Sequence, residues 1–349
     1  MVALHPVILC GGSGVRLWPL SNARRSKPFI PLVDGQSTFA QTLARLAAVK
    51  DAAAPIVVAG PAHVEAILAE FAASGIEGTV IVEPVGRDSA PAMAAAAHYI
   101  QDRFPGEVAL FLAADHHIPD PRAYAATVAV AAAQARLGSI VTLGVRPTGP
   151  STAYGYIAPG EPLEAGAYRV EGFAEKPDET TAQAFLRQGR LWNGGMFIVR
   201  SDVLLSELEA HAPAIGLAAR AAVDGAEVEG RLVRLGEAFL TAPKISIDYA
   251  VMEHTALAAV TPADFAWSDL GAWDAVLEVS ARDEHGNSAE GAVTLAGAEN
   301  CLVRAEGGVK VVAVGVKNLA IVAGPDGIMV CDLDALDQIK DAVGRAQES

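Results

Sequence analysis

Cysteine is scarce in this sequence of 349 residues. Only Cys10, Cys301 and Cys331 are present; they lie far apart, no two form a CxxC pair, and no two histidines stand at the spacing of metal ligands. Disulfide frameworks and zinc sites depend on such patterns, so neither is indicated. We predict that the three cysteines are packing residues.

Long apolar runs and an excess of positive charge are also missing. No uninterrupted apolar stretch reaches the roughly 18 residues needed to cross a bilayer, and the N-terminus has no signal-peptide pattern. We therefore expect a cytoplasmic protein without membrane association. Lys and Arg number 26 against 41 Asp and Glu, which gives a formal net charge of −15. Because such a surface repels polyanions outside local basic spots, no nucleic-acid partner is expected.

Apolar residues, by contrast, are abundant at 52% of the chain, which is enough to bury a core and argues against disorder. In the first half, short runs rich in Val and Ile alternate with Ala-rich stretches, as in βα units that build a mostly parallel sheet. The predicted strands are 6–10, 55–59, 79–83, 108–113 and 140–144, and the predicted helices are 38–49, 62–73, 90–104 and 122–137.

From about residue 147 the chain is punctuated by Gly and Pro, which predicts an insert on the same sheet. Its strands are expected at 154–158, 168–175 and 195–200, followed by helical material. After a turn-rich stretch at 281–290, β-like runs at 309–314, 319–322 and 328–331 precede an amphipathic end. We expect a main domain of residues 1–282 and a small β-rich C-terminal domain of residues 283–349 with a closing helix. No long-range repeat is evident.

A glycine-rich loop, Gly11-Gly12-Ser13-Gly14, follows the first predicted strand. Glycines let a backbone approach a ligand closely and offer N–H groups to phosphate. The dinucleotide fingerprint fails because Leu17 stands at its sixth position, and the Gly-Lys-Ser/Thr of a P-loop is absent. Residues 1–33 contain no Asp or Glu, and the basic residues there are Arg16, Arg24, Arg25 and Lys27. A solvated glycine turn is the alternative, but the segregated charge favours an anion-binding loop.

Two aspartates follow strand-like runs. Asp115 comes after the predicted strand 108–113, so its carboxylate is expected at the carboxyl end of a parallel strand, where open α/β sheets bind ligands. Asp269 ends a second such run. Two carboxylates, completed by substrate phosphates and water, are a usual way of holding Mg²⁺. Taken singly, each aspartate fits a capping or turn role equally well.

At this point the sequence resembles the sugar-1-phosphate nucleotidylyltransferases, and within them the mannose-1-phosphate guanylyltransferase branch. Six segments carry the resemblance in order along the chain. They are GGSGVRLWPL (11–20) followed by Lys27-Pro28, EPVGRDSAPA (83–92), FAEKP (173–177), WNGGMF (192–197), SIDYAVME (246–253) and WSDLGAW (267–273). Three departures from the family pattern are Ala114 for Pro, Asp88-Ser89 for Asn-Thr, and Gly194 for Ser. The chain resembles a short form without the isomerase domain of bifunctional members.

The resemblance implies a Rossmann-like, GT-A-like nucleotidyltransferase domain with a small β-helix-like C-terminal domain. It also implies the reaction of GTP with mannose 1-phosphate, which gives GDP-mannose and pyrophosphate through attack of the sugar phosphate on the α-phosphorus. Such chemistry requires positioning, cations and a divalent metal rather than a covalent enzyme intermediate. A homodimer is expected from the same resemblance.

The resemblance also assigns roles to residues. Asp115 and Asp269 would hold Mg²⁺, Arg16 would hold the triphosphate, and Lys27 would neutralise phosphate near the reacting centre. The sugar-phosphate residues would be Glu175, Lys176, Asn193 and Asp248. The nucleotide residues would be Gly11, Gly12, Ser13, Gly14, Glu83, Gly86 and Arg87. His116 and His117 are expected to be structural, because the attacking phosphate is already anionic.

Three other functions stay open at this point. A thymidylyl- or uridylyltransferase acting on glucose 1-phosphate uses the same chemistry. An NAD-dependent dehydrogenase fits the βα rhythm, although the missing third glycine argues against it. A non-catalytic binding or regulatory subunit fits the fold, although such a chain has no chemical need for all of the charged residues assigned above.

Overall fold

The structure is a computed structural model that describes residues 3–12, 14–22 and 25–348. The chain forms two compact units. The first comprises Met1–Gly11, Leu43–Ala114 and Ile118–Trp267, and the second comprises Gly12–Thr42, Asp115–His117 and Ser268–Ser349. Within the described ranges, no helix is both long enough and apolar enough to span a membrane.

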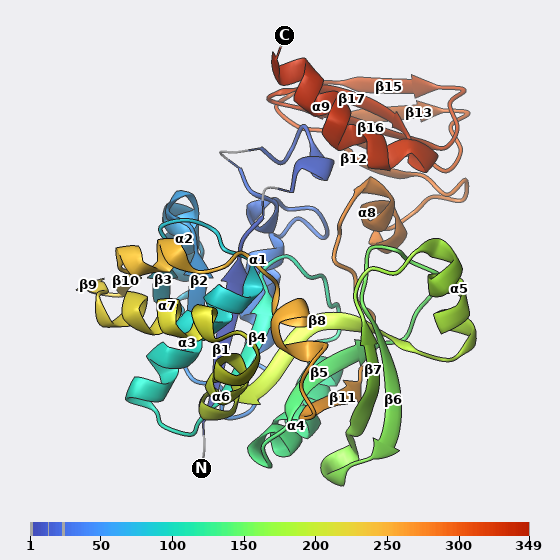
Figure 1. Ribbon diagram of the computed structural model, residues 1–349. Helices are drawn as coiled ribbons and strands as arrows, with labels where there is room; N and C mark the ends of the chain where they lie inside the picture. The colour runs from blue at the N-terminus through green and yellow to red at the C-terminus, as the bar shows by residue number, and fades with distance from the viewer. Residues whose placement is uncertain (1–2, 13, 23–24, 349) are drawn as a thin grey trace. The chain divides into compact units, whose positions relative to one another are not determined.

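The first unit is built on a mixed sheet of 11 strands (Figure 1). Its parallel part runs in the order β4-β1-β2-β3-β10, and β9 pairs antiparallel with β10 at the edge. These strands are β1 (Leu4–Cys10), β2 (Ile56–Ala59), β3 (Thr79–Val82), β4 (Val108–Ala113), β9 (Glu227–Glu229) and β10 (Leu232–Arg234). The other part is joined through the antiparallel pair β4–β8. It holds β5 (Ile140–Val145), β6 (Tyr156–Pro162), β7 (Tyr168–Ala174), β8 (Leu191–Arg200) and β11 (Ala258–Pro262).

Helices cover this sheet because alternate strand residues present apolar side chains to each face. One face packs in a single core with α3 (Ser89–Arg103), α6 (Ser201–His211) and α7 (Pro213–Asp224). Helix α4 (Pro121–Arg136) packs on β5, β8 and β11, and Asp120 caps it by accepting hydrogen bonds from the backbone N–H groups of Arg122 and Ala123. The α-helices α2 (Val64–Ser74) and α5 (Glu179–Arg187) also belong to this unit, and Asp248–Met252 forms a single π-helical turn. The predicted mixed, mostly parallel sheet is confirmed.

The second unit contains the strand-rich C-terminal region. Strands β12 (Ser288–Gly291), β14 (Leu302–Ala305), β16 (Leu319–Gly324) and β17 (Gly327–Asp332) form one sheet, and β13 (Val293–Ala296) pairs with β15 (Val311–Val314). All pairs except β16–β17 are parallel. The expected β-rich C-terminal region is therefore confirmed.

A short local repeat lies within these strands, and it was missed in the sequence analysis. Leu302 pairs with Ala320 and Val293 with Val311, with the same sequence spacing in both pairs. Gly297 and Gly315 both have left-handed backbones, as do Asn300 and Asn318. The Asn300 amide donates a hydrogen bond to Asn318 Oδ1 at 2.9 Å, so equivalent corners of two successive coils stack on each other.

The second unit also takes in the glycine-rich loop and its continuation. Helix α1 (Thr38–Leu46) begins here, and α8 (Trp273–Val279) and α9 (Ile339–Glu348) complete the unit. The whole of the predicted C-terminal domain, residues 283–349, thus lies in one compact unit with residues 12–42, 115–117 and 268–282. A domain boundary at 282/283 stays a prediction.

Candidate active site

The second unit brings together three of the predicted catalytic residues. The Lys27 ammonium lies 2.7 Å from Asp115 Oδ2, and it also donates a hydrogen bond to the backbone carbonyl of Asp269. Lys27 is only 6% exposed. Lysine is rarely buried without an anionic partner, and Asp115 is that partner here. Residues from three distant parts of the sequence therefore meet at one buried cation.

Two local features of the backbone make this cluster. His117 and Ser268 exchange backbone hydrogen bonds of 2.9 and 3.0 Å, which ties the segment after Asp115 to the segment before Asp269. Gly14 has φ 60°, and a Cβ there would lie 2.7 Å from Lys27 Cβ. A side chain at position 14 would therefore push Lys27 away, which is a specific reason for glycine at that point of the loop.

The charges in this cluster support one another. Burial raises the pKa of Asp115, but the Lys27 ammonium and His116 outweigh burial and hold that pKa below its usual value. In the described part of the chain, no three His, Cys, Asp or Glu residues form a group that could hold a metal ion. Asp115 and Asp269 offer only hard oxygen donors, and such a pair suits a cation whose other ligands come from phosphate and water.

The glycine-rich loop is open where a phosphate would need it to be. Gly11 and Gly12 are exposed and have nothing within 4 Å of the position of an added Cβ. Arg16 is exposed and lies in a short 3₁₀ turn, Val15–Leu17. Ser13 and Arg24 fall outside the described residues.

The first unit brings together the four predicted sugar-phosphate residues. Lys176 Nζ pairs with Glu175 Oε1 at 2.9 Å, and Asn193 Nδ2 donates to Asp248 Oδ1 at 2.8 Å. Thr142 Oγ1 donates to Asn193 Oδ1 at 2.9 Å, and this residue was missed in the sequence analysis. Its only signal is a hydroxyl in the otherwise apolar strand β5. Because Thr142 fixes the amide, Asn193 presents its N–H group to Asp248.

Two carboxylates in this cluster are poorly compensated. Glu175 Oε2 is buried and accepts no hydrogen bond from the described residues. Burial and then the Glu175 charge raise the pKa of Asp248 to about 6. Lys176, with 59% of its side chain exposed, is held at its base by a left-handed backbone with φ 47°. A buried acceptor without a donor, a second carboxylate beside it and a neighbouring exposed cation are suited to a ligand that carries both hydroxyl and phosphate groups.

The predicted nucleotide turn also lies in the first unit. Glu83 extends β3, is 8% exposed, and has an Oε1 atom without a hydrogen-bond partner in the described ranges. Burial raises its pKa to about 7. Gly86 is exposed, whereas Arg87 donates to the carbonyl of Leu240. Ser89 Oγ accepts a hydrogen bond from Ile247 N at 2.9 Å, so this turn and the segment that carries Asp248 are held together.

Comparisons with known proteins identify the family of the chain. A family model described as nucleotidyl transferase matches residues 5–286, so the chain belongs to that family and is a nucleotidyltransferase enzyme. The mannose-1-phosphate guanylyltransferase of Escherichia coli is 40% identical over 351 residues, covering 97% of this chain and 73% of the relative. The xanthan biosynthesis protein XanB of Xanthomonas campestris is 41% identical over 347 residues, covering 99% of this chain and 73% of that protein.

A solved structure matches along the whole chain. The crystal structure of mannose-1-phosphate geranyltransferase from Thermus thermophilus has a TM-score of 0.87 and 33% sequence identity, and the match covers 99% of both chains. The predicted family is confirmed by these matches.

Proposed function

We propose that this protein transfers GMP from GTP to mannose 1-phosphate and releases GDP-mannose and pyrophosphate. The observation that carries the proposal is the buried Lys27 ammonium held between Asp115 and Asp269, because a phosphate-transfer site needs a cation and hard oxygen ligands in one place. Relatives about 40% identical over nearly the whole chain, named mannose-1-phosphate guanylyltransferases, supply the choice of substrates.

Positioning and charge stabilisation would account for the rate. The phosphate of mannose 1-phosphate is already an anionic nucleophile, so no general base is required, and His117 is instead bound to Gln41 Oε1 at 2.9 Å. Arg16 would hold the departing pyrophosphate with its forked guanidinium, and Lys27 would neutralise charge near the α-phosphate. Divalent metals are general in this family. We assign Mg²⁺ to Asp115 and Asp269, where it would supply Lewis-acid stabilisation of the phosphates.

The sugar cluster of the first unit would bind mannose 1-phosphate. The exposed Lys176 ammonium is assigned to its phosphate, and the buried Glu175 Oε2 and the half-buried Asp248 carboxylate are assigned to its hydroxyls. Asn193 would orient Asp248 rather than bind the sugar alone, because Thr142 and Asp248 already occupy both ends of its amide.

Glu83 would read the guanine base. A carboxylate can accept from the N1–H and the 2-amino group of guanine together, and both are donors. Glu83 is buried and has an unpartnered oxygen, which suits this role because binding guanine would satisfy an acceptor that is already withdrawn from water. Uracil and thymine lack the 2-amino donor.

Replacing Glu83 by Gln should lower kcat/KM for GTP by roughly 10- to 100-fold, since one charge-assisted pair of hydrogen bonds is lost. With the pKa of Glu83 at about 7, the free protein binds a proton there below pH 7 and carries the ionised acceptor above it. The kcat/KM for GTP should therefore rise as pH passes through about 7, and this rise should be absent in Glu83→Gln.

Inosine triphosphate is the matched control for this prediction because it lacks only the 2-amino group. The wild-type preference for GTP over inosine triphosphate should disappear in Glu83→Gln, while turnover with inosine triphosphate changes less. An unchanged preference in the variant would remove Glu83 from base recognition and leave the reaction type untouched.

Lys176→Ala and Arg16→Ala should separate the two substrates. Lys176→Ala should raise KM for mannose 1-phosphate by roughly 10- to 100-fold, the value of one hydrogen bond to a charged group, with little change for GTP. Arg16→Ala should mainly damage use of the triphosphate. Steady-state kinetics with each substrate varied in turn measures both, and Arg187→Ala in α5 serves as a control for lost surface charge. If Lys176→Ala behaved like Arg187→Ala, the Lys176–Glu175 pair would be a surface ion pair only.

The activity itself is tested by incubating the purified protein with Mg²⁺, each sugar 1-phosphate and each nucleoside triphosphate, and detecting pyrophosphate and nucleotide sugar. Product from dTTP or UTP with glucose 1-phosphate at a higher rate would place the chain with thymidylyl- or uridylyltransferases. No product with any pair would favour a binding subunit, and a titration with NADH tests the dehydrogenase. A homodimer, a cytoplasmic location and the lack of a nucleic-acid partner stay predictions.

A further inference from the structure

The segment that carries Arg16 and Lys27 is folded into the core of the C-terminal strands. Leu17, Leu20, Ile30 and Leu32 are at most 1% exposed and belong to one apolar cluster with side chains from α8, β14, β16, β17 and α9. Their burial ties the conformation of residues 14–22 and 25–33 to the C-terminal region of the same unit. This region is therefore part of the structure that shapes the loop.

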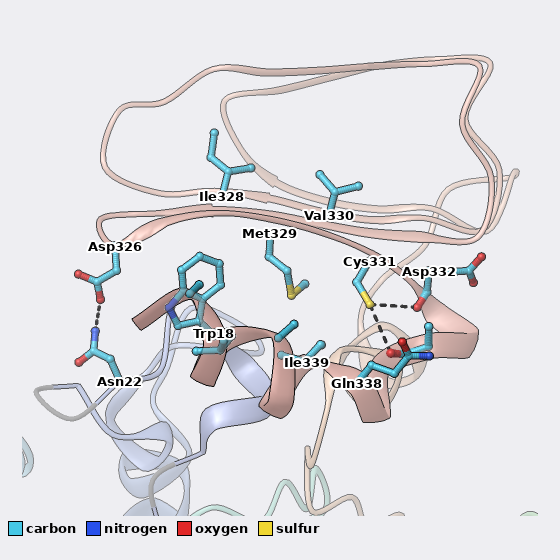
Figure 2. A pocket seen from close by; sticks show the side chains of 14 residues that line it. Trp18, Asn22, Asp326, Ile328, Met329, Val330, Cys331, Asp332, Gln338 and Ile339 are labelled. Carbon is cyan, nitrogen blue, oxygen red and sulfur yellow. Dashed lines mark hydrogen bonds between the residues drawn. The ribbon is translucent and has the colours of Figure 1, made fainter. Parts of the chain in front are cut away.

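The turn between β16 and β17 contacts the segment that follows the glycine-rich loop. A Cβ at Gly324 would lie 2.8 Å from Leu20, and a Cβ at Gly327 would lie 2.8 Å from the ring of Trp18. Asn22 donates a hydrogen bond to Asp326 in the same turn. Figure 2 shows this bond, with Trp18 on the side of β17 toward which Met329 points.

One buried arginine makes the most specific link. Arg304 in β14 is 3% exposed, and its guanidinium donates to the carbonyls of Leu32 and Pro31 at 2.7 Å each. Glu290 on the neighbouring strand lies 2.8 Å from the same guanidinium and balances its charge. A planar fork that binds two successive carbonyls fixes the direction of the backbone at that point, which a single-point donor cannot do.

The carbonyls that Arg304 holds come just after the turn that presents Lys27. Residues Lys27–Phe29 form a 3₁₀ turn, and Ile30 N donates to Lys27 O at 3.1 Å to close it. The buried Lys27 ammonium donates hydrogen bonds to both Asp115 Oδ2 and the Asp269 carbonyl. A small rotation of the turn Lys27–Phe29 would therefore break both contacts.

We propose that Arg304 is a positioning residue, which holds the backbone at Pro31 and Leu32 and thereby keeps Lys27 between Asp115 and Asp269. The proposal rests on the proposed role of Lys27 in phosphate transfer. Arg304 itself touches no substrate. Its loss should lower kcat through Lys27 and leave KM for mannose 1-phosphate unchanged.

A double-mutant cycle tests this coupling. Arg304→Met should lower kcat roughly tenfold or more in the wild-type background and by less than about twofold when Lys27 is already Met, because residues that act as a unit are not additive. Equal losses in both backgrounds would overturn the proposal, since Arg304 would then act independently of Lys27. If Lys27→Met left turnover unchanged, the proposed role of Lys27 would fail instead.

A second readout does not depend on catalysis. The rate at which acetic anhydride labels Lys27, followed by mass spectrometry, should be slow in the wild type and several-fold faster in Arg304→Met. Unchanged protection would overturn the proposal even if activity fell. Lys317→Met, which removes an exposed ion pair to Glu299 in the same region, should alter neither readout. If Arg304→Met does not fold, Arg304→Lys replaces it, because lysine keeps the charge but lacks the forked guanidinium. The same double-mutant cycle and the same labelling experiment then apply, and both effects should be intermediate.

Discussion

Asp115→Asn and Asp269→Asn should each lower Mg²⁺-dependent turnover by roughly 10²- to 10³-fold, the range seen when one preorganised group at a reacting phosphate or oxyanion is removed. An amide has nearly the size of a carboxylate but carries no charge, so it is a weak ligand for a hard divalent cation. Raising the Mg²⁺ concentration should restore part of the activity in both variants.

The two variants should differ in stability. Lys27 pairs with the side chain of Asp115 but with the backbone carbonyl of Asp269. Asp115→Asn therefore removes the charge partner of a buried ammonium, at a cost of about 1.5–3 kcal/mol, whereas Asp269→Asn keeps the contact to Lys27. Thermal unfolding should show a lower Tm for Asp115→Asn alone.

Turnover and Tm, measured together with circular dichroism, check both parts. Asp274→Asn, an exposed aspartate in the first turn of α8, is the matched control and should change neither quantity much. Near-normal turnover of a folded Asp115→Asn or Asp269→Asn variant at ordinary Mg²⁺ would remove that residue from the metal site.

The parallel half of the sheet could be predicted because its strands have a clear local pattern. Each is a short apolar run followed by a helix, and the predicted strand 108–113 coincides with β4 (Val108–Ala113). The four predicted helices of the first half begin and end within about three residues of α1 to α4. Buried strands between amphipathic or Ala-rich helices give a strong local signal, because both faces of the sheet must be covered by apolar surface.

The weaker elements could not be predicted because tertiary pairing creates them. Strand β9 is exposed along its whole length and pairs with its neighbour β10. The pair reaches the rest of the sheet through β3, and β11 pairs with β5 and β7, all of which are far away in sequence. Strands β12, β13 and β14 are only four residues long each. The sequence signal for the two successive coils is that Gly297 and Asn300 recur as Gly315 and Asn318. A pattern that occurs only twice is difficult to recognise as a repeat.

In the candidate site, too, the identity of the charged residues could be predicted from the sequence, whereas the contacts that hold them in place could not. Motifs located the charged residues, and the chain folds so that Lys27 meets Asp115 and Asn193 meets Asp248. The hydrogen bonds that hold these residues in place could not be predicted from motifs. Thr142 sits in an apolar strand and Arg304 in a C-terminal strand, and neither position has a local pattern that points to its hydrogen-bond partners.

The wild-type protein should prefer mannose 1-phosphate over glucose 1-phosphate by about 10⁴-fold in kcat/KM with GTP. This preference should depend on the Glu175 and Asp248 carboxylates of the first unit. The two sugars differ in the orientation of one hydroxyl. A site built from buried acceptors discriminates that strongly because the wrong epimer leaves an acceptor without its donor, whereas an apolar pocket reaches only about 10- to 200-fold. Glu175 Oε2 is such an acceptor, and Asp248 lies in the same cluster.

Asp248→Asn should reduce this preference to about 10²-fold, mostly by weakening use of mannose 1-phosphate, because the ionised acceptor and its charge are gone. The same loss should appear in the wild type at low pH. With the pKa of Asp248 raised to about 6, the free protein carries a proton there below pH 6, so the preference should fall between about pH 7.5 and pH 5.5. Asp248→Asn should show no such fall.

Competition assays with equal concentrations of the two sugar phosphates at both pH values measure this preference. Glu171→Gln, on the exposed part of β7, is the control and should keep the wild-type preference and its pH dependence. A wild-type preference near about 10²-fold that ignores both pH and Asp248→Asn would mean that shape alone selects the sugar. In that case Glu175 and Asp248 would have a structural role only. The proposed reaction type would then be supported by Lys27, Asp115 and Asp269 alone.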